Sequence, residues 1–146
     1  MAINQISVFL ENKPGQLAEF TRLLEQNQID MRALSIAETQ DFGILRLIVD
    51  DPYDTVNVAK DAGYICAVTS VLAIEIPDKP GSLVKMLSVL GEAGINVEYT
   101  YAFLTRKKDV AYMIFRVNDP DKASEALVRS GVRPLAQDDL AALFAD

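Results

Sequence analysis

The sequence predicts an α+β protein made of two tandem βαββαβ units, each an antiparallel sheet with two helices on one face. One observation is a repeated turn, present as Asn12-Lys13-Pro14-Gly15-Gln16-Leu17 and again as Asp78-Lys79-Pro80-Gly81-Ser82-Leu83. The other is that an alternating apolar run precedes each turn and a helical pattern follows it. Such a repeat indicates two compact halves, and we expect one domain over residues 1–70 and another over 71–146.

The first half contains the complete set of elements once. We predict strands at 3–10, 29–37, 44–49 and from 64, and helices at 14–27 and 51–62. Pro14 suits the first position of a helix, because its missing N–H group would have no partner there. Asp51-Pro52 is a helix start of the same kind, and Gly63 suits the left-handed position after a helix.

The second half repeats this order, with Asp119-Pro120 and Gly131 at the corresponding places. We predict helices at 80–93 and from 120, strands at 95–104, 111–117 and 132–135, a hairpin at 105–109, and a short closing helix at 137–144. The stretch 65–76 contains no Gly, Pro, Asn or Asp. It therefore predicts one long strand of about 40 Å that links the halves without a flexible tether.

Composition narrows the range of functions. The formal net charge of −7 argues against a broad nucleic-acid surface, which would need a basic face. The chain has no histidine and one cysteine, Cys66, so an imidazole metal site, a Ser-His nucleophile and an internal disulfide are all excluded. We expect no metal, cofactor or catalytic residue. No apolar run is long enough for a membrane span, and we expect a cytoplasmic protein.

The repeated turn is itself a candidate binding site. Glycine allows a small molecule to approach the backbone closely, and the free N–H groups of the first helical turn can hold an anion such as a carboxylate. The alternative is that Pro-Gly only makes a turn, which Asn or Asp then caps.

A βαββαβ unit with Lys-Pro-Gly-x-Leu after its first strand and Gly-Ile-Asn-Val at the start of its second resembles the ACT domain. Nearly the whole chain is similar to a tandem pair of such domains, and the run Asn96 to Phe103 resembles a motif of that group. The first half departs from the pattern, with Gln28 in the place of Gly94 and Asp30 in that of Asn96. The resemblance implies a stand-alone regulatory protein that binds an amino acid.

In a ferredoxin-like plait the turn after strand one and the start of strand two lie at opposite ends of the sheet, so one domain cannot bring them together. Two domains paired through strand two would do so. We expect the turn 12–17 to meet 95–99, and the turn 78–83 to meet 29–33, within one chain or between two. The ligand-binding residues expected on this basis are Asn12, Pro14, Gly15, Gln16, Leu17, Asp30, Met31, Asp78, Pro80, Gly81, Ser82, Leu83, Asn96, Val97 and Tyr99.

The roles follow from the chemistry of an α-amino acid. Its carboxylate would accept hydrogen bonds from backbone N–H groups of either turn, and its ammonium group would meet Asn12, Asp30, Asp78 or Asn96. Alternation would place Val97, Tyr99, Tyr101 and Phe103 on one face of strand two, either lining the pocket or simply packing.

Three functions remain open at this point. The chain would be a non-enzymatic amino-acid sensor, a homodimer acting on a metabolic enzyme or regulator; or a small ferredoxin-like enzyme of isomerase or degradative type; or a structural subunit without a ligand. The sequence does not name the amino acid or the pathway.

Overall fold

The computed structural model describes residues 2–103 and 107–144 of the 146-residue chain. These residues form two compact units, an N-terminal unit over Asn4–Thr69 and a C-terminal unit that contains the described chain from Ser70 onward together with residues 2 and 3. No helix in the described ranges is both long and apolar enough to span a bilayer.

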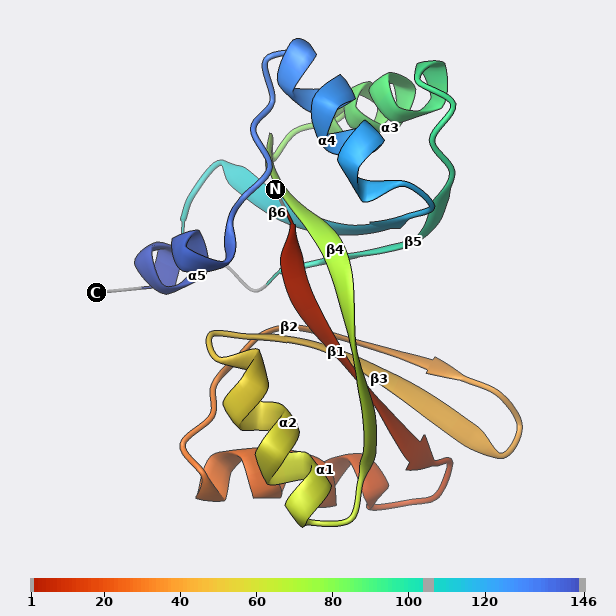
Figure 1. The fold of residues 1–146 in the computed structure, drawn as a ribbon, viewed down its shortest axis with the longest axis vertical. Coiled ribbons are helices and arrows are strands. Elements are labelled where there is room, and N and C mark those ends of the chain that lie inside the picture. Colours follow the sequence, from red (N-terminus) through yellow and green to blue (C-terminus); the bar gives the residue numbers. More distant parts are fainter. Residues whose placement is uncertain (1, 104–106, 145–146) are drawn as a thin grey trace. The chain divides into compact units, whose positions relative to one another are not determined.

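The N-terminal unit has the predicted βαββαβ order. Its elements are β1 (Ile3–Glu11), α1 (Gln16–Gln26), β2 (Met31–Glu38), β3 (Phe42–Val49), α2 (Pro52–Asp61) and the first part of β4 (Ile65–Pro77). The strand order is β2-β3-β1-β4, and β3 pairs antiparallel with both β1 and β2. Helices α1 and α2 lie together on one face of this sheet (Figure 1).

The core of the N-terminal unit lies between its sheet and these two helices. Alternate residues of β1 and β3 point into it and meet Phe20 and Leu24 of α1. Both helical residues belong to the predicted apolar stripe and are almost fully buried. At the start of α2, the Asp51 side chain accepts a hydrogen bond from the Asp54 N–H, which confirms the predicted Asp-Pro helix start.

The C-terminal unit contains the rest of β4, followed by α3 (Ser82–Glu92), β5 (Val97–Ala102), β6 (Val110–Val117), α4 (Pro120–Arg129) and α5 (Gln137–Phe144). Its strand order is β4-β6-β5. Helices α3 and α4 cover one face of the sheet, and α5 lies on the opposite face (Figure 1). The prediction of helices on one face therefore holds for the two repeat helices, whereas α5 is an addition that covers the other face.

Two predictions about this unit need correction or lie outside the described ranges. No strand forms over residues 132–135, although the Leu135 N–H bonds to the Ala73 carbonyl oxygen at 2.8 Å. Pro134 has no N–H group to offer, which weakens pairing at this point. Residue 104 of the predicted strand 95–104 and residues 105 and 106 of the predicted hairpin lie outside the described residues.

Both helices that follow the repeated turn begin two residues later than predicted. Gly15 and Gly81 have φ angles of 84° and 91°, so neither can be a helical residue, and α1 and α3 begin immediately after them. Pro14 and Pro80 are consequently turn residues and not the first residues of the helices. The long strand is confirmed, because β4 runs without interruption over 13 residues.

Candidate functional site

The repeated turn has the same backbone hydrogen bonds in both units. In the first copy the Asn12, Lys13 and Gln16 N–H groups bond to the Asp41, Glu11 and Lys13 carbonyl oxygens at 3.1, 2.9 and 3.3 Å. In the second copy Asp78, Lys79 and Ser82 bond to Asp109, Pro77 and Lys79 at 2.9, 3.0 and 3.3 Å. Each turn is therefore held both by its own chain and by the neighbouring hairpin.

The glycines of these turns are required by backbone conformation. A Cβ atom added to Gly15 or Gly81 would meet nothing within 4 Å, but the positive φ angle strains any L side chain. The turn thus leaves open space beside the first turn of the helix, where N–H groups have no intrahelical partner. This is the arrangement in which a helix N-terminus can bind a carboxylate.

A cavity of about 390 Å³ adjoins the first turn. Three of the residues predicted from sequence, Asn12, Gln16 and Leu17, line it, and Pro14 and Gly15 form the turn beside it. The remaining lining residues come from the turn itself, from the ends of β1 and β2 and from the start of β3: Lys13, Leu10, Glu11, Ile36, Glu38 and Gly43. Its volume lies within the range of small-molecule sites.

Asn12 connects the two sides of this cavity through hydrogen bonds. Its side-chain amide donates to Glu38 Oε2 at 3.3 Å and to the Thr39 carbonyl oxygen at 3.4 Å, which ties the turn to the β2–β3 hairpin. On the other side, Lys13 pairs with Glu11, and this pairing raises the pKa of the Lys13 ammonium group. The cavity therefore combines an apolar floor with carboxylates, a lysine and a helix N-terminus.

The second turn contains a buried polar atom without a partner. Ser82 is 6% exposed, and its hydroxyl oxygen makes no hydrogen bond to any residue that the structure describes. Leaving such a group unpaired costs about 1–3 kcal/mol. Its neighbours in the predicted set behave differently: Asp78, Pro80 and Gly81 are exposed in the turn, and Leu83 packs against the core of the C-terminal unit.

In the N-terminal unit, the start of strand two lies at a different cavity from the first turn. Asp30 lines a cavity of about 170 Å³ that shares no residue with the cavity at the first turn. Asp30 accepts from Arg32 at 3.2 Å, and Arg32 also makes a two-pronged contact with Asp50 at 3.0 and 2.8 Å. The expected separation of the turn from the start of strand two within one plait is therefore present in the N-terminal unit.

Backbone geometry at the start of strand two is the same in both units despite the sequence difference. Gln28 has a φ angle of 57° and Gly94 one of 74°. In both units the N–H group of the next residue, Ile29 or Ile95, donates a hydrogen bond to a carbonyl oxygen of the preceding helix. In the C-terminal unit, the Asn96 N–H also bonds to the Asn118 side chain at 3.0 Å. Gln28 thus adopts the left-handed conformation without being glycine.

A bulge corrects the predicted face of strand two. Val97 pairs with Val117 but Tyr99 pairs with Arg116, so one extra residue separates them. Val97 consequently packs against the core under α3 and α4, and Met31, at the equivalent bulge in β2, packs against the other core. Tyr99, Tyr101 and Phe103 lie on the opposite face, where the rings of Tyr99 and Tyr101 stack 6.4 Å apart.

Sequence analysis missed the residues that close the cavity from the hairpin side. Ile36 and Glu38 lie at the end of β2, whereas the prediction concentrated on its start. The missing information is register: Gly43 pairs with both Leu10 and Glu38, which brings the ends of three strands together. The short turn at 39–41 and the end of β1 were the signals that could have indicated it.

The chain was also compared with known proteins. A family model described as an ACT domain pair matches residues 1–144. Protein BT0572 from Bacteroides thetaiotaomicron is 41% identical, with 96% of each chain covered and a TM-score of 0.89. The comparison with curated proteins found no match.

More distant solved structures share the fold. The regulatory subunit of aspartate kinase from Thermus thermophilus, in its ligand-free form, is 14% identical with a TM-score of 0.66, covering 87% of this chain and 91% of that one. The corresponding subunit from Thermus flavus is 15% identical with a TM-score of 0.64, covering 87% and 88%. With the family model matching almost the entire chain, the protein belongs to the ACT domain pair family.

Proposed function

We propose that this protein is a non-enzymatic regulator that binds an amino acid at an interface between ACT domains. The cavity of about 390 Å³ at the first turn carries this proposal, because it combines a helix N-terminus, an apolar floor and a carboxylate. The regulatory subunits of aspartate kinase share the fold, which is consistent with a regulatory role.

The cavity has groups suited to each part of an amino acid. The carboxylate would accept hydrogen bonds from the first-turn N–H groups of α1, near Gln16 and Leu17. The ammonium group would meet Glu38, whose Oε2 already accepts from Asn12. Leu10, Leu17 and Ile36 provide the apolar contact for a side chain.

The second turn supplies a further group for a ligand. Ser82 Oγ lies at the first position of α3 with no partner among the described residues. A carboxylate held by the N-terminus of α3 would accept a hydrogen bond from this hydroxyl.

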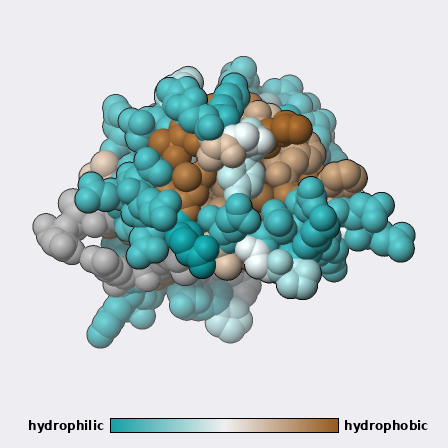
Figure 2. All heavy atoms as spheres, turned by 90° about the horizontal axis from the view of Figure 1, so that it is seen from below, coloured by the Kyte–Doolittle hydropathy of each residue, from teal (hydrophilic) through white to brown (hydrophobic). Residues whose placement is uncertain are grey.

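We propose that a second copy of the chain completes each site through strand-two pairing. Strands β2 and β5 are each at an edge of their unit's sheet, and an edge strand offers unpaired backbone groups. On β2, Leu34 and Ile36 are 39% and 51% exposed. A homodimer formed through β2 would cover these two side chains. The face drawn in Figure 2 also carries hydrophobic residues surrounded by hydrophilic ones.

Thermal melting of the full chain against the twenty amino acids tests this function. Selective stabilisation by one amino acid, with its affinity then measured by calorimetry, is the expected result. If no amino acid stabilises a correctly folded protein, the proposal is wrong and a structural role remains.

A pair of charge variants locates the binding site. Gln16→Glu adds a negative charge inside the cavity, and Ala18→Glu adds one to the same helical turn at an exposed position outside it. The helix dipole stabilises a negative charge at either position, because both lie near the helix N-terminus. We expect Gln16→Glu to weaken binding about tenfold or more, since repulsion from the carboxylate costs about 1–3 kcal/mol, and Ala18→Glu to have less effect. Equal effects would remove the cavity from the site.

A further inference from the structure

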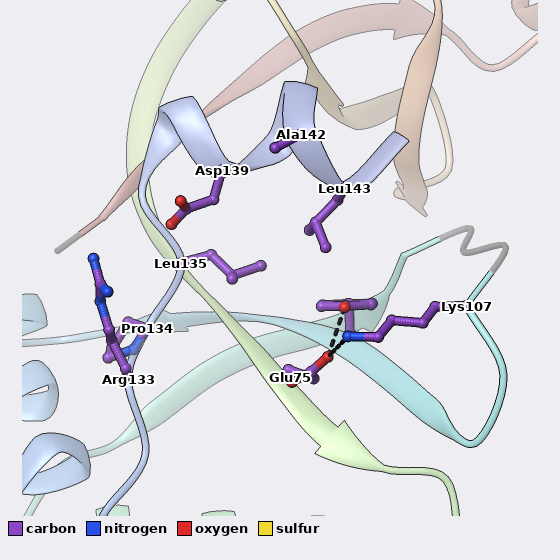
Figure 3. Close-up of a pocket in the computed structure, with 9 residues that line it drawn as sticks. Glu75, Lys107, Arg133, Pro134, Leu135, Asp139, Ala142 and Leu143 are labelled. Carbon is purple, nitrogen blue, oxygen red and sulfur yellow. Dashed lines mark hydrogen bonds and ion pairs between the residues drawn. The ribbon is translucent and has the colours of Figure 1, made fainter. Parts of the chain in front are cut away.

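A second cavity, of about 360 Å³, lies wholly within the C-terminal unit. It lies at the sheet face opposite α3 and α4, where α5 packs (Figure 3). Nine residues line it: Glu75, Lys107, Tyr112, Arg133, Pro134, Leu135, Asp139, Ala142 and Leu143. None of them belongs to the repeated turns or to the starts of strand two, so this cavity is separate from the sites proposed above.

The wall formed by the sheet carries a compact polar cluster. Glu75 Oε1 accepts hydrogen bonds from the Tyr112 hydroxyl at 2.7 Å and from Lys107 Nζ at 2.9 Å. Both donors share one carboxylate oxygen, and the structure shows no hydrogen bond to Glu75 Oε2 from the described residues. Tyr112 is 1% exposed, which fixes its hydroxyl and therefore orients Glu75.

The opposite wall comes from the segment 133–143. Pro134, Leu135, Ala142 and Leu143 make it largely apolar. Asp139 Oδ2 accepts from the Ala136 N–H at 2.7 Å and so caps the start of α5. In Figure 3, Arg133 and Asp139 lie toward one end of the cavity, Glu75 and Lys107 lie toward the other, and Leu135 lies between them.

The charges around the cavity select the kind of ligand. Two carboxylates, Glu75 and Asp139, and two cations, Lys107 and Arg133, give a balanced set. A strongly anionic ligand such as a phosphate would face both carboxylates, and a polyamine would face both cations. A zwitterion satisfies both signs, and guanidinium and ammonium groups have several donors each, so one partner does not exhaust them.

We propose that this cavity binds a small zwitterion with an apolar body, of the size of leucine, methionine or phenylalanine. Its ammonium group bonds to Glu75 Oε2, its carboxylate bonds to the neighbouring Lys107 Nζ, and its apolar part contacts Leu135, Ala142 and Leu143. The volume is sufficient for such a molecule.

The ligand also holds α5 in place. Six of the nine lining residues belong to the segment from Arg133 to Leu143, and the other three belong to β4, β6 or the chain just before β6. A molecule that contacts both walls stabilises the docked position of α5 and not the undocked one. Binding at this cavity is therefore expected to slow amide exchange in α5.

The experiment uses the full chain with L-leucine, L-methionine and L-phenylalanine as zwitterionic probes, each at about 1 mM, the concentration at which a weak site begins to fill. 4-Methylpentanoate and 3-methylbutylamine each retain the apolar body of leucine but lack one charge. At least one zwitterion should bind in calorimetry and slow amide exchange in α5. If leucine binds, 4-methylpentanoate and 3-methylbutylamine should each bind with less than about a tenth of the leucine affinity.

Two variants assign the binding. Glu75→Gln removes the acceptor charge, and Leu143→Trp fills the cavity while leaving the polar cluster intact. Both should lower the affinity of the zwitterion about tenfold or more, whereas Glu92→Gln, at an exposed position on α3, should not. Absence of α5 protection by all three zwitterions, or affinity unchanged in Leu143→Trp, would overturn this inference.

Glu75→Gln and Leu143→Trp, compared with Gln16→Glu, separate the two proposals. Binding that is sensitive to Gln16→Glu alone contradicts the cavity under α5 and supports the turn site. Binding that is sensitive to Glu75→Gln and Leu143→Trp alone supports the inference and contradicts the turn site.

Discussion

At the scale of single residues, Gln28 adopts a left-handed backbone conformation that is unfavourable for glutamine and that glycine adopts freely. Its φ of 57° corresponds to 74° at Gly94, and in both units a bond to the preceding helix follows. The left-handed region costs an L-residue about 1–2 kcal/mol. The two halves therefore differ in sequence at this position but have the same backbone conformation.

Substitutions at these two positions should have opposite effects on stability. Gln28→Gly is expected to raise the free energy of unfolding by about 0.5–1 kcal/mol, because the relief of strain exceeds the added entropy of the unfolded chain. Gly94→Ala is expected to lower it by about 1–2 kcal/mol. Urea unfolding midpoints measure both, and a less stable Gln28→Gly protein would show that Gln28 is not strained.

Ser82 leads to a prediction with an unusual sign. Because its buried hydroxyl has no partner among the described residues, Ser82→Ala should leave the ligand-free protein equally stable or about 1 kcal/mol more stable. The matched control is Thr55→Val, because the Thr55 hydroxyl is also buried but bonds to the Asp51 carbonyl oxygen at 2.9 Å. That variant should lose about 1 kcal/mol. Loss of stability in Ser82→Ala would mean that the hydroxyl has a partner.

Glu75 should make stability depend on acid. Hydrogen bonds from Lys107 and Tyr112 hold the pKa of this carboxyl below its ordinary value of 4.5. The unfolded chain therefore takes up the proton first as pH falls, so the stabilisation is present above pH 4.5 and is lost below it. Denaturant unfolding should show that the difference in the free energy of unfolding between the native protein and Glu75→Gln becomes smaller from about pH 5 to pH 3.

A suitable control for this acid dependence is Glu92→Gln, an exposed glutamate on α3. A difference that stays constant with pH in Glu75→Gln would contradict the role of the cluster.

At the scale of elements, punctuation residues made the fold predictable. Asp-Pro pairs, left-handed glycines and the repeated turn act through local backbone preferences, so they located the helices and the 13-residue strand. The missing strand at 132–135 and the hairpin side of the cavity depend on pairing between distant segments. Local pattern carries no information about that register.

The closing helix α5 was predicted in its extent but not in its role. Leu140 is fully buried, whereas its neighbour Ala141 is exposed, so one residue anchors the helix to the sheet. The same packing buries Ala73 and Tyr112, on the face without repeat helices.

Removing this anchor should release α5. Leu140→Ala is expected to lower the free energy of unfolding of the C-terminal unit by about 2–4 kcal/mol and to speed amide exchange in α5. Leu87→Ala on α3, where the leucine is 37% exposed, is the matched control and should cost about 1 kcal/mol or less. Unchanged exchange in α5 would show that other contacts hold it.

At the scale of the whole molecule, the proposed function depends on assembly. The turn and the start of strand two lie at separate cavities of the N-terminal unit, so the proposed site needs a second ACT domain to bring them together. Family membership explains why regulation is a reasonable role, but neither the effector nor the target enzyme follows from it. The ligand screen identifies the first of these.

Assembly itself can be tested with two lysine variants. Leu34 on β2 is 39% exposed and Leu87 on α3 is 37% exposed, so a lysine at either position should be tolerated by the fold. If strand-two pairing forms the dimer, Leu34→Lys should raise its dissociation constant about tenfold or more, and Leu87→Lys should not. Analytical ultracentrifugation measures both, and equal effects would exclude pairing through β2.

The two left-handed glycines have a consequence for access. With nothing within 4 Å of the position a Cβ atom would occupy, Gly15 and Gly81 shape their turns and at the same time keep an unobstructed path to the helix N-terminus. A substitution there closes the path and distorts the turn together. In the proposed sites, the missing Cβ atom therefore determines both the conformation of the turn and the access of a ligand to its backbone.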